Sequence, residues 1–570
     1  MSISFSLKKH SGLAVASIAL ACFTSAAAEP SSYYKNEKLF STRPSEKKSV
    51  NTIGRFGPVG MGIDLIQPAF TMRIKNIEEG SPAAITGKLK KGQIIESING
   101  QKLADIDPRM QLAQIMGAAE AKDGVLKFAI TGETEPVVVK LPVLGAYSET
   151  WPLNCPKSEK IISNFADYLA KPESDKGRFG LGILFLLSTG DDKYLPVVKK
   201  WAHGVGNSQY AWALGYGGLP LCEYYLRTGD QEILPKIQKW VDLAVAGQYN
   251  DSWAGRGGVP KITYGMGHLN AAATGVLTFL LMAKECGAEV PEHALQGALR
   301  HFYRYAGRGG NPYGDDRPEL GFVDNGKNGL LAFAMAAAAA LDPDGEQSIY
   351  AAARDVCSKQ SFYTTSFMLH GHTGGGIGEL WRSPAMGLIK EKKPKQYRDF
   401  MDSRRWHYEL SRRWDGSFAI LGGAGYDDTN WGAGYGLAYT VPRKSLRLTG
   451  ALPSKFSKRF NLPDRPWGTA ADDQFVTLDP VPFPDGSKPY FSGETLAKDS
   501  SMQFIRWFHS AEKQPSDEQV WKYLHHHSHN IRFIAASKIL GVNSGYIGWR
   551  APGGEIRPDL FAKALKSKSP

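Results

Sequence analysis

Side chains that could transfer protons are concentrated in glycine-rich stretches of the sequence. In the richest of these, residues 370–381, His372 and Glu379 could serve as proton donor and acceptor. Seven residues apart, they would share one face of a helix, but the glycine run between them disfavours a helix there. The alternative interpretation is a close helix contact made by glycine, with its histidines hydrogen-bonded inside the fold.

Four more candidates flank predicted helices. His268 lies at the start of an alanine-rich helix, Asp324 precedes another, Asp415 begins an Asp-Gly-Ser-Phe turn, and Asp428 lies among aromatic residues. Aromatic rings beside carboxylates suit sugars, because sugar CH faces stack on the rings and paired carboxylates can perform hydrolysis. Each candidate also has a structural alternative, as a hydrogen-bonded capping histidine, a helix N-cap or a loop turn.

The sequence predicts no metal and no cofactor. The tract from His525 to His529 could bind a metal, but no acid or cysteine lies near it, so a solvated surface tract is the preferred interpretation. The cysteines beyond residue 28 form no C-x-x-C pair and are interpreted as buried thiols, with one or two disulfides left open as the alternative. These cysteines are Cys155, Cys222, Cys286 and Cys357. Serine protease and zinc protease motifs are absent.

The N-terminus predicts export. Lys8 and Lys9 precede a short apolar run, and Ala26-Ala27-Ala28 offers a cleavage site, so residues 1–28 are interpreted as a signal peptide and the protein as secreted or periplasmic. A lipoprotein attached through Cys22 is the less favoured alternative, because Ala19 stands where leucine is usual. No later stretch approaches the length of a transmembrane helix.

The net charge indicates the kind of partner. It is +12, of which Lys8 and Lys9 supply two, leaving +10 after removal of residues 1–28. This excess favours anionic partners such as an acidic polysaccharide. Nucleic acid is not an expected partner, because the sequence has no dense arginine and lysine stripe and no nucleic-acid motif.

Residues 51–145 follow a linker predicted at 29–50 and resemble a PDZ domain. The resemblance rests on Gly-Ser-Pro-Ala at 80–83 and on the run from Leu89 to the Asn-Gly turn at 99–100. It implies a groove in which a peptide C-terminus adds as an extra strand. It also implies a loop whose backbone N–H groups face the peptide carboxylate, here Gly60, Met61, Gly62 and Ile63. The alternative is a groove filled by the protein's own linker or by a neighbouring domain.

Residues 160–445 have a helical pattern with an internal repeat. Thr189-Gly190-Asp191 recurs as Thr228-Gly229-Asp230, each followed by Leu-Pro and Lys-Trp, which predicts helix–turn–helix units of about 40 residues. Long glycine-rich and aromatic loops alternate with such tight turns. This alternation resembles the α/α toroids of polysaccharide lyases, glycoside hydrolases and terpenoid cyclases, although short repeats alone would also suit an open solenoid. Terpenoid chemistry is disfavoured, because Asp427-Asp428-Thr429-Asn430 lacks a third acid.

The predicted fold class is therefore multidomain. A small mixed α/β PDZ-like domain precedes a large all-α domain with the α/α toroid arrangement, a proline-rich linker at 446–492 and a short helical, HEAT-like region at 493–570. The pairing resembles a family of exported bacterial proteins, which implies a fold but no assigned activity. Two functions follow as expectations: a polysaccharide hydrolase or lyase at the toroid mouth, or a non-catalytic envelope scaffold that binds peptides through its PDZ groove.

Overall fold

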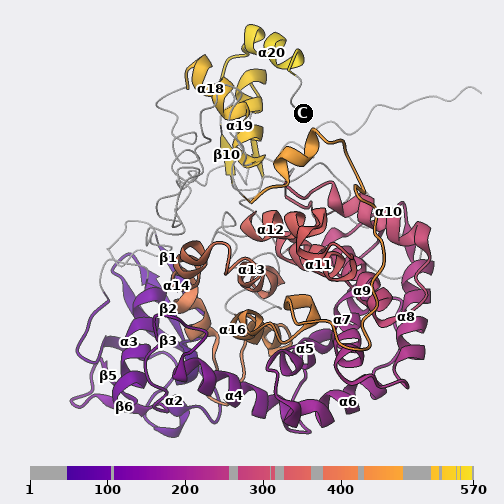
Figure 1. The fold of residues 1–570 in the computed structure, drawn as a ribbon. Coiled ribbons are helices and arrows are strands. Elements are labelled where there is room, and N and C mark those ends of the chain that lie inside the picture. The colour runs from indigo at the N-terminus through magenta and orange to yellow at the C-terminus, as the bar shows by residue number, and fades with distance from the viewer. Residues whose placement is uncertain are drawn as a thin grey trace, which may run out of the picture.

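The computed structural model combines a sheet domain, a ring of helices and a small C-terminal unit (Figure 1). It describes residues 48–103, 108–255, 267–307, 310–312, 314, 327–360, 377–420, 429–478, 515–525, 529–542, 544–546, 549–551 and 554–567. The predicted signal peptide and nearly all of the predicted linker at 29–50 lie outside these residues. Among the described helices, none has both the length and the apolarity that a membrane crossing requires.

The N-terminal domain is a six-stranded antiparallel sheet whose strands pair in sequence order. The strands are β1 (Ser49–Ile53), β2 (Met61–Gln67), β3 (Thr71–Ile77), β4 (Ile94–Ile98), β5 (Val125–Ile130) and β6 (Val137–Lys140). A single 3₁₀ turn, η1 (Gly57–Val59), joins β1 to β2. Helix α2 (Pro82–Ile85) begins at Ser81, whose hydroxyl accepts the N–H of Ala84, and α3 (Pro108–Lys122) packs on the sheet. Strand β1 begins at Ser49, inside the linker predicted at 29–50, so the sheet starts two residues before the predicted domain boundary.

The helical domain is a closed ring in which outer and inner helices alternate along the chain. The outer helices are α4 (Pro156–Ala170), α6 (Leu195–Gly204), α8 (Leu234–Ala246), α10 (Glu292–Tyr303), α12 (Ile349–Gln360) and α14 (Pro394–Ser411). The inner helices are α5 (Leu181–Ser188), α7 (Ala211–Thr228), α9 (Asn270–Cys286), α11 (Lys327–Leu341), α13 (Ile377–Gly387) and α16 (Leu437–Thr440). Each inner helix contacts the next, and α16 returns to contact α5, so the ring closes and an open solenoid is excluded.

The composition of the inner helices explains why they lie inside. Helices α5, α9 and α11 are apolar around their whole circumference and are buried over nearly their full length. Helix α7 approaches α9 closely at two glycines, since a Cβ on Gly215 would lie 2.7 Å from the backbone of Gly275. The helical pattern predicted for residues 160–445 is confirmed by these helices.

The repeated Thr-Gly-Asp turns are confirmed as helix–helix connections. Gly190 and Gly229 have φ of 80° and 69°, the left-handed conformation that glycine adopts without strain. The side chains of Asp191 and Asp230 accept the N–H groups of Lys193 and Glu232, and the Leu-Pro pairs then start α6 and α8.

The middle of the ring is filled with aromatic side chains. The indole N–H of Trp381 on α13 donates to the hydroxyl of Tyr216 on α7, at 2.9 Å. Phe333 on α11 stacks edge-on against the same indole, with ring centres 5.4 Å apart. Within the described residues the inner faces of α7, α11 and α13 therefore pack against one another through these rings.

The remainder of the described chain wraps the ring and adds a small unit. Residues 446–478 lie against the ring, where the Arg447 side chain pairs with Glu285 at 2.6 Å and Tyr350 donates to the carbonyl of Pro463. The C-terminal unit contains α18 (Asp517–Leu524), α19 (His529–Leu540), β9 (Ser544–Tyr546), β10 (Trp549–Ala551) and α20 (Pro558–Leu565). It touches the ring where Arg532 donates to the carbonyl of Gly307 at 3.1 Å.

Candidate functional site

The chain positions of the six candidate catalytic residues follow one rule. Each falls on a connection from an outer helix to the next inner helix, or in the first turn of that inner helix. Because the helices alternate in direction, all connections of this kind leave the ring at one end, called the loop end here. Asp324, His372 and Asp428 lie outside the described residues, whereas His268, Glu379 and Asp415 can be placed.

His268 is buried next to the start of α9. Its Nε2 lies 2.6 Å from the carbonyl of Tyr249, and its ring meets the ring of His301 edge-on, with centres 5.2 Å apart. Burial, together with Arg304 and His268, lowers the pKa of His301 to about 3, so His301 is neutral at physiological pH. Its Nε2 lies 3.2 Å from the side-chain oxygen of Asn270, the first residue of α9. His301 was not predicted from the sequence, and it lies in the last turn of α10.

Glu379 is fully buried at the start of α13 and is held by two arginines. Its Oε2 lies 2.5 Å from the guanidinium groups of Arg382 and Arg404, and its Oε1 accepts the hydroxyls of Tyr408 and Ser383. Both carboxylate oxygens are thus engaged. This environment suits an anchor that joins α13 to α14 better than a group that exchanges protons with a substrate.

Asp415 lies beyond the end of α14, beside the PDZ domain. Its Oδ1 accepts the N–H and the hydroxyl of Ser417, at 3.0 and 2.6 Å, which fixes the Asp-Gly-Ser-Phe turn. Its Oδ2 lies 3.5 Å from Arg413, which also pairs with Glu78 of the PDZ domain. The three described candidates therefore have three separate sets of partners.

Aromatic residues line the ring where the inner helices begin. We call this group the aromatic floor; it consists of Phe179, Tyr210, Trp212 and Trp431. Phe179 contacts Tyr210 and Trp431 with ring centres 5.9 and 6.1 Å apart, and Trp212 lies 6.1 Å from Trp431. Tyr210 is 36% exposed, and the guanidinium of Arg178 lies 5.4 Å from the Trp431 ring. The sequence signal for this floor is an aromatic residue at or just before the first turn of the inner helices α5 and α7.

The predicted carboxylate-binding loop is buried from Gly60 to Ile63. The Gly60 N–H donates to Gly57, and its carbonyl accepts from the N–H of Glu78 and the hydroxyl of Ser81. The indole of Trp414, just beyond α14, covers this loop, since it would lie 3.1 Å from a Cβ added to Gly60.

The PDZ domain is joined to the ring by a buried network of two acids and two bases. Glu120 on α3 lies 2.8 Å from Lys157 of α4 and 2.7 Å from Arg412, and Glu409 of α14 contacts the same two bases. Burial would raise the pKa of Glu409, but Arg412 and Lys157 lower it to about 2. A cavity of about 530 Å³ lies beside this network, between the small residues of α3 and the side chains of Arg405 and Trp406.

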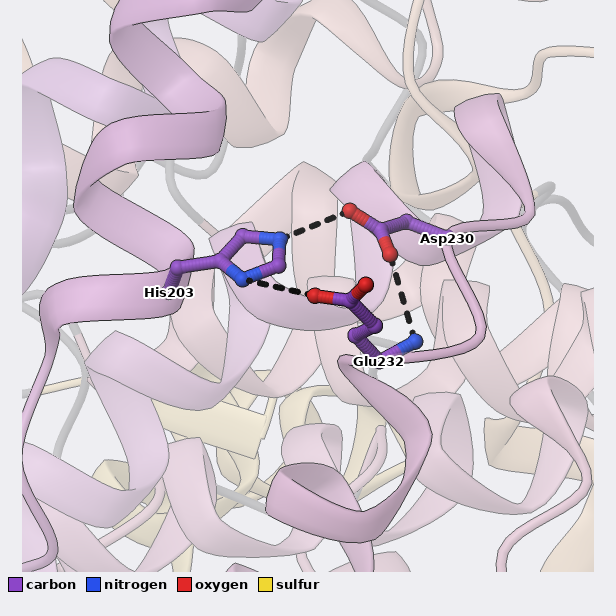
Figure 2. Close-up of side chains that lie close together, drawn as sticks. All are labelled: His203, Asp230 and Glu232. Carbon is purple, nitrogen blue, oxygen red and sulfur yellow. Dashed lines mark hydrogen bonds and ion pairs between the residues drawn. The ribbon is translucent and has the colours of Figure 1, made fainter.

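One group among the described residues approaches the spacing of metal ligands: His203, Asp230 and Glu232. Figure 2 shows that the two ring nitrogens face different carboxylates, with Nε2 2.8 Å from Asp230 and Nδ1 3.5 Å from Glu232. A metal ion binds only one ring nitrogen, so this geometry bridges two acids rather than forming a chelate. Asp230 also accepts the hydroxyl of Tyr224 and the N–H of Glu232, which identifies the group as part of the Thr-Gly-Asp turn.

The fold, together with the buried contact between its two large domains, defines a protein in which a PDZ domain is docked on a closed ring of helices. A PDZ family model matches residues 51–130, which makes the N-terminal domain a protein-interaction module. The family described as a domain of unknown function (DUF6288) matches residues 158–450, more than half of the chain, and the chain belongs to this family. A search of curated proteins and a search of solved structures each found no match.

Proposed function

We propose that the protein is exported and acts on an extracellular polysaccharide at the loop end of its ring, as a hydrolase or a lyase. The observation that carries this proposal is the aromatic floor, because sugar rings stack their CH faces on aromatic rings. Tyr210 is the exposed member of the floor and Phe179 is partly exposed, and the exposed cation of Arg178 lies beside the Trp431 ring. An excess of ten positive charges beyond residue 28 favours an acidic polysaccharide.

The reacting groups in this proposal are Asp324, His372 and Asp428. Along the chain, all three fall between an outer helix and the next inner helix. Two carboxylates with a histidine suffice for either reaction class: paired acids for hydrolysis, a base for elimination. His268 and Glu379 have positioning roles, since the first is tied to the Tyr249 carbonyl and the second to two arginines. Asp415 has the same kind of role at its turn.

A glycan panel tests the proposal in two steps. Binding is measured first, with Tyr210→Ala, whose loss of one stacked ring should weaken binding about three- to tenfold. Phe561→Ala is the matched control, because Phe561 is 40% exposed but lies on α20 of the C-terminal unit. Release of reducing ends or of unsaturated sugars is then measured for Asp324→Asn, His372→Ala and Asp428→Asn. Full activity in these three variants, or no retained glycan in the panel, would reject the proposal.

The second candidate function is a non-catalytic scaffold of the cell envelope that binds peptide C-termini. The PDZ family match favours it. A negative glycan panel combined with capture of C-terminal peptides from an array would select this function over catalysis.

A further inference from the structure

Strand β2 of the PDZ domain has a neighbour on each edge. One edge pairs with β3 and the other with β1, in antiparallel register from Ser49 opposite Gln67 to Ile53 opposite Ile63. A peptide ligand of a PDZ domain adds to the sheet as an extra antiparallel strand in its groove. In this protein the edge of β2 that faces away from β3, where such a peptide would pair, is occupied by the protein's own strand β1.

The direction of β1 is that of a bound peptide. A peptide whose C-terminus meets the loop at Gly60–Ile63 has to run toward that loop, and β1 does so, since its last residue lies opposite Ile63. The carbonyl of Gly54, the residue after β1, takes the place of the carboxylate of a bound peptide. Its oxygen would lie 3.1 Å from a Cβ added to Gly62 in the loop.

The side chain at the end of β1 is buried, as the last side chain of a bound peptide would be. Ile53 is 3% exposed and belongs to the buried core cluster of the PDZ domain, which also contains Met116 of α3 and Leu410 of α14. The rest of the strand is held more lightly, since Val50 is 56% exposed and the side-chain bond from Thr52 to Asp64 lies at a partly exposed position.

We propose that β1 is an intramolecular ligand that keeps the PDZ groove closed. A partner protein whose C-terminus is extended and ends in an aliphatic residue opens the groove by displacing it. The strand is short, five residues long, and lies at the edge of the sheet, so its loss leaves the rest of the sheet paired. The loop stays in place, because Trp414 covers Gly60 and Gly80 from the end of α14.

Tethering sets how strongly β1 competes. A segment joined by a short linker acts at an effective concentration on the order of 1 mM. If β1 binds its groove with an intrinsic Kd on the order of 10 μM, an external peptide of equal affinity would bind about 100-fold more weakly than to an open groove. Opening the strand should therefore increase peptide affinity by one to two orders of magnitude.

The experiment uses the full chain and a fluorescent peptide that ends in Ser-Val-Asn-Thr-Ile with a free carboxylate, which is the sequence of β1 itself. Consecutive N–H groups of a strand point to opposite sides, so Val50→Pro combined with Asn51→Pro removes one N–H that faces β2. This variant should bind the peptide at least tenfold more tightly than the wild type does. It should bind the same peptide with a C-terminal amide at least tenfold more weakly than the peptide with a free carboxylate. Ser45→Pro with Glu46→Pro, in the segment before the strand, is the control and should match the wild type.

A disulfide that can be formed and reduced in the same protein tests the proposal without relying on a variant that could misfold. Thr52 and Asp64 lie opposite each other in the register, so Thr52→Cys with Asp64→Cys allows a disulfide that fixes β1 on β2. The oxidised protein should not bind the peptide, and reduction should restore wild-type binding. Equal binding before and after reduction, or a double-proline variant that binds no better than the wild type, would overturn the inference. Neither result affects the glycan assay, so the two proposals can fail separately.

Discussion

At the scale of single residues, burial decides what a carboxylate can do. Glu223 on α7 is buried and accepts the N–H groups of Arg447 and Leu448, at 2.9 and 2.8 Å. Burial raises its pKa from 4.5 to about 7, against the opposing effect of these two N–H groups. The native state therefore binds a proton that the unfolded chain releases between these two pH values.

This raised pKa predicts that stability falls with pH. The contribution of Glu223 is fully present below pH 4.5 and is lost as pH rises through 7, by about 3 kcal/mol. Glu223→Gln should resemble the wild type at pH 5 and exceed its free energy of unfolding at pH 8, as measured by urea denaturation. Glu232→Gln, at a side chain that is 81% exposed, is the control and should show no such change. A difference between Glu223→Gln and wild type that is the same at both pH values would contradict this.

Glu379 differs from Glu223 because its buried carboxylate is paired with two positively charged side chains. Glu379→Gln leaves Arg382 and Arg404 buried without their anion and should lower the free energy of unfolding by about 3–5 kcal/mol. Glu391→Gln, at a half-exposed ion pair with Lys444, should change it by less than about 1 kcal/mol. Thermal melting of both variants checks this, and equal melting temperatures would show that the cluster contributes nothing.

The sequence suggested candidate residues, but it could not show their partners in the fold. Glycine-rich context suggested Glu379 as a proton acceptor, but the context gave no sign of Arg404, which reaches it from 25 residues away, on another helix. The same holds for His268, which the pattern marked at a helix start while its partner His301 gave no signal in α10. Contacts between helices depend on how they pack, and spacing along one helix does not encode that.

At the scale of elements, the repeat predicted the turns but not their surroundings. Gly190 and Gly229 are equivalent in sequence and both are left-handed. A Cβ on Gly190 would meet only the Ser445 side chain, at 3.0 Å, whereas one on Gly229 would lie 2.0 Å from the ring of Phe456. The residues that make this difference come from the segment after the ring, which a local pattern cannot show.

The two turns therefore give a matched pair of variants. Gly190→Ala should cost about 1 kcal/mol, the usual penalty for alanine in the left-handed conformation. Gly229→Ala should cost at least about 1 kcal/mol more, because the Phe456 ring also has to move. Urea denaturation of both proteins measures the difference. Equal losses would mean that Phe456 moves aside without cost.

At the scale of the whole molecule, the order of domains could be predicted and their docking could not. Composition and motif separated the PDZ domain from a large helical region, and both are confirmed. The contact between them joins Glu120 to Arg412, which are 292 residues apart, and buries Trp406 and Leu410 of α14 in the PDZ core cluster. Such long-range pairing leaves no periodic signal in the sequence.

This docking predicts that the PDZ domain and the ring unfold together. Calorimetry of the wild type should show one transition for the two domains, because they share a buried cluster and a buried charge network. In Glu120→Gln the bases Lys157 and Arg412 retain only Glu409, so docking should weaken by about 3–5 kcal/mol and a separate, earlier PDZ transition should appear. Glu96→Gln, at an exposed position on β4, should keep the single transition. A Glu120→Gln trace that overlays the wild type would mean that apolar packing by α14 alone holds the PDZ domain on the ring.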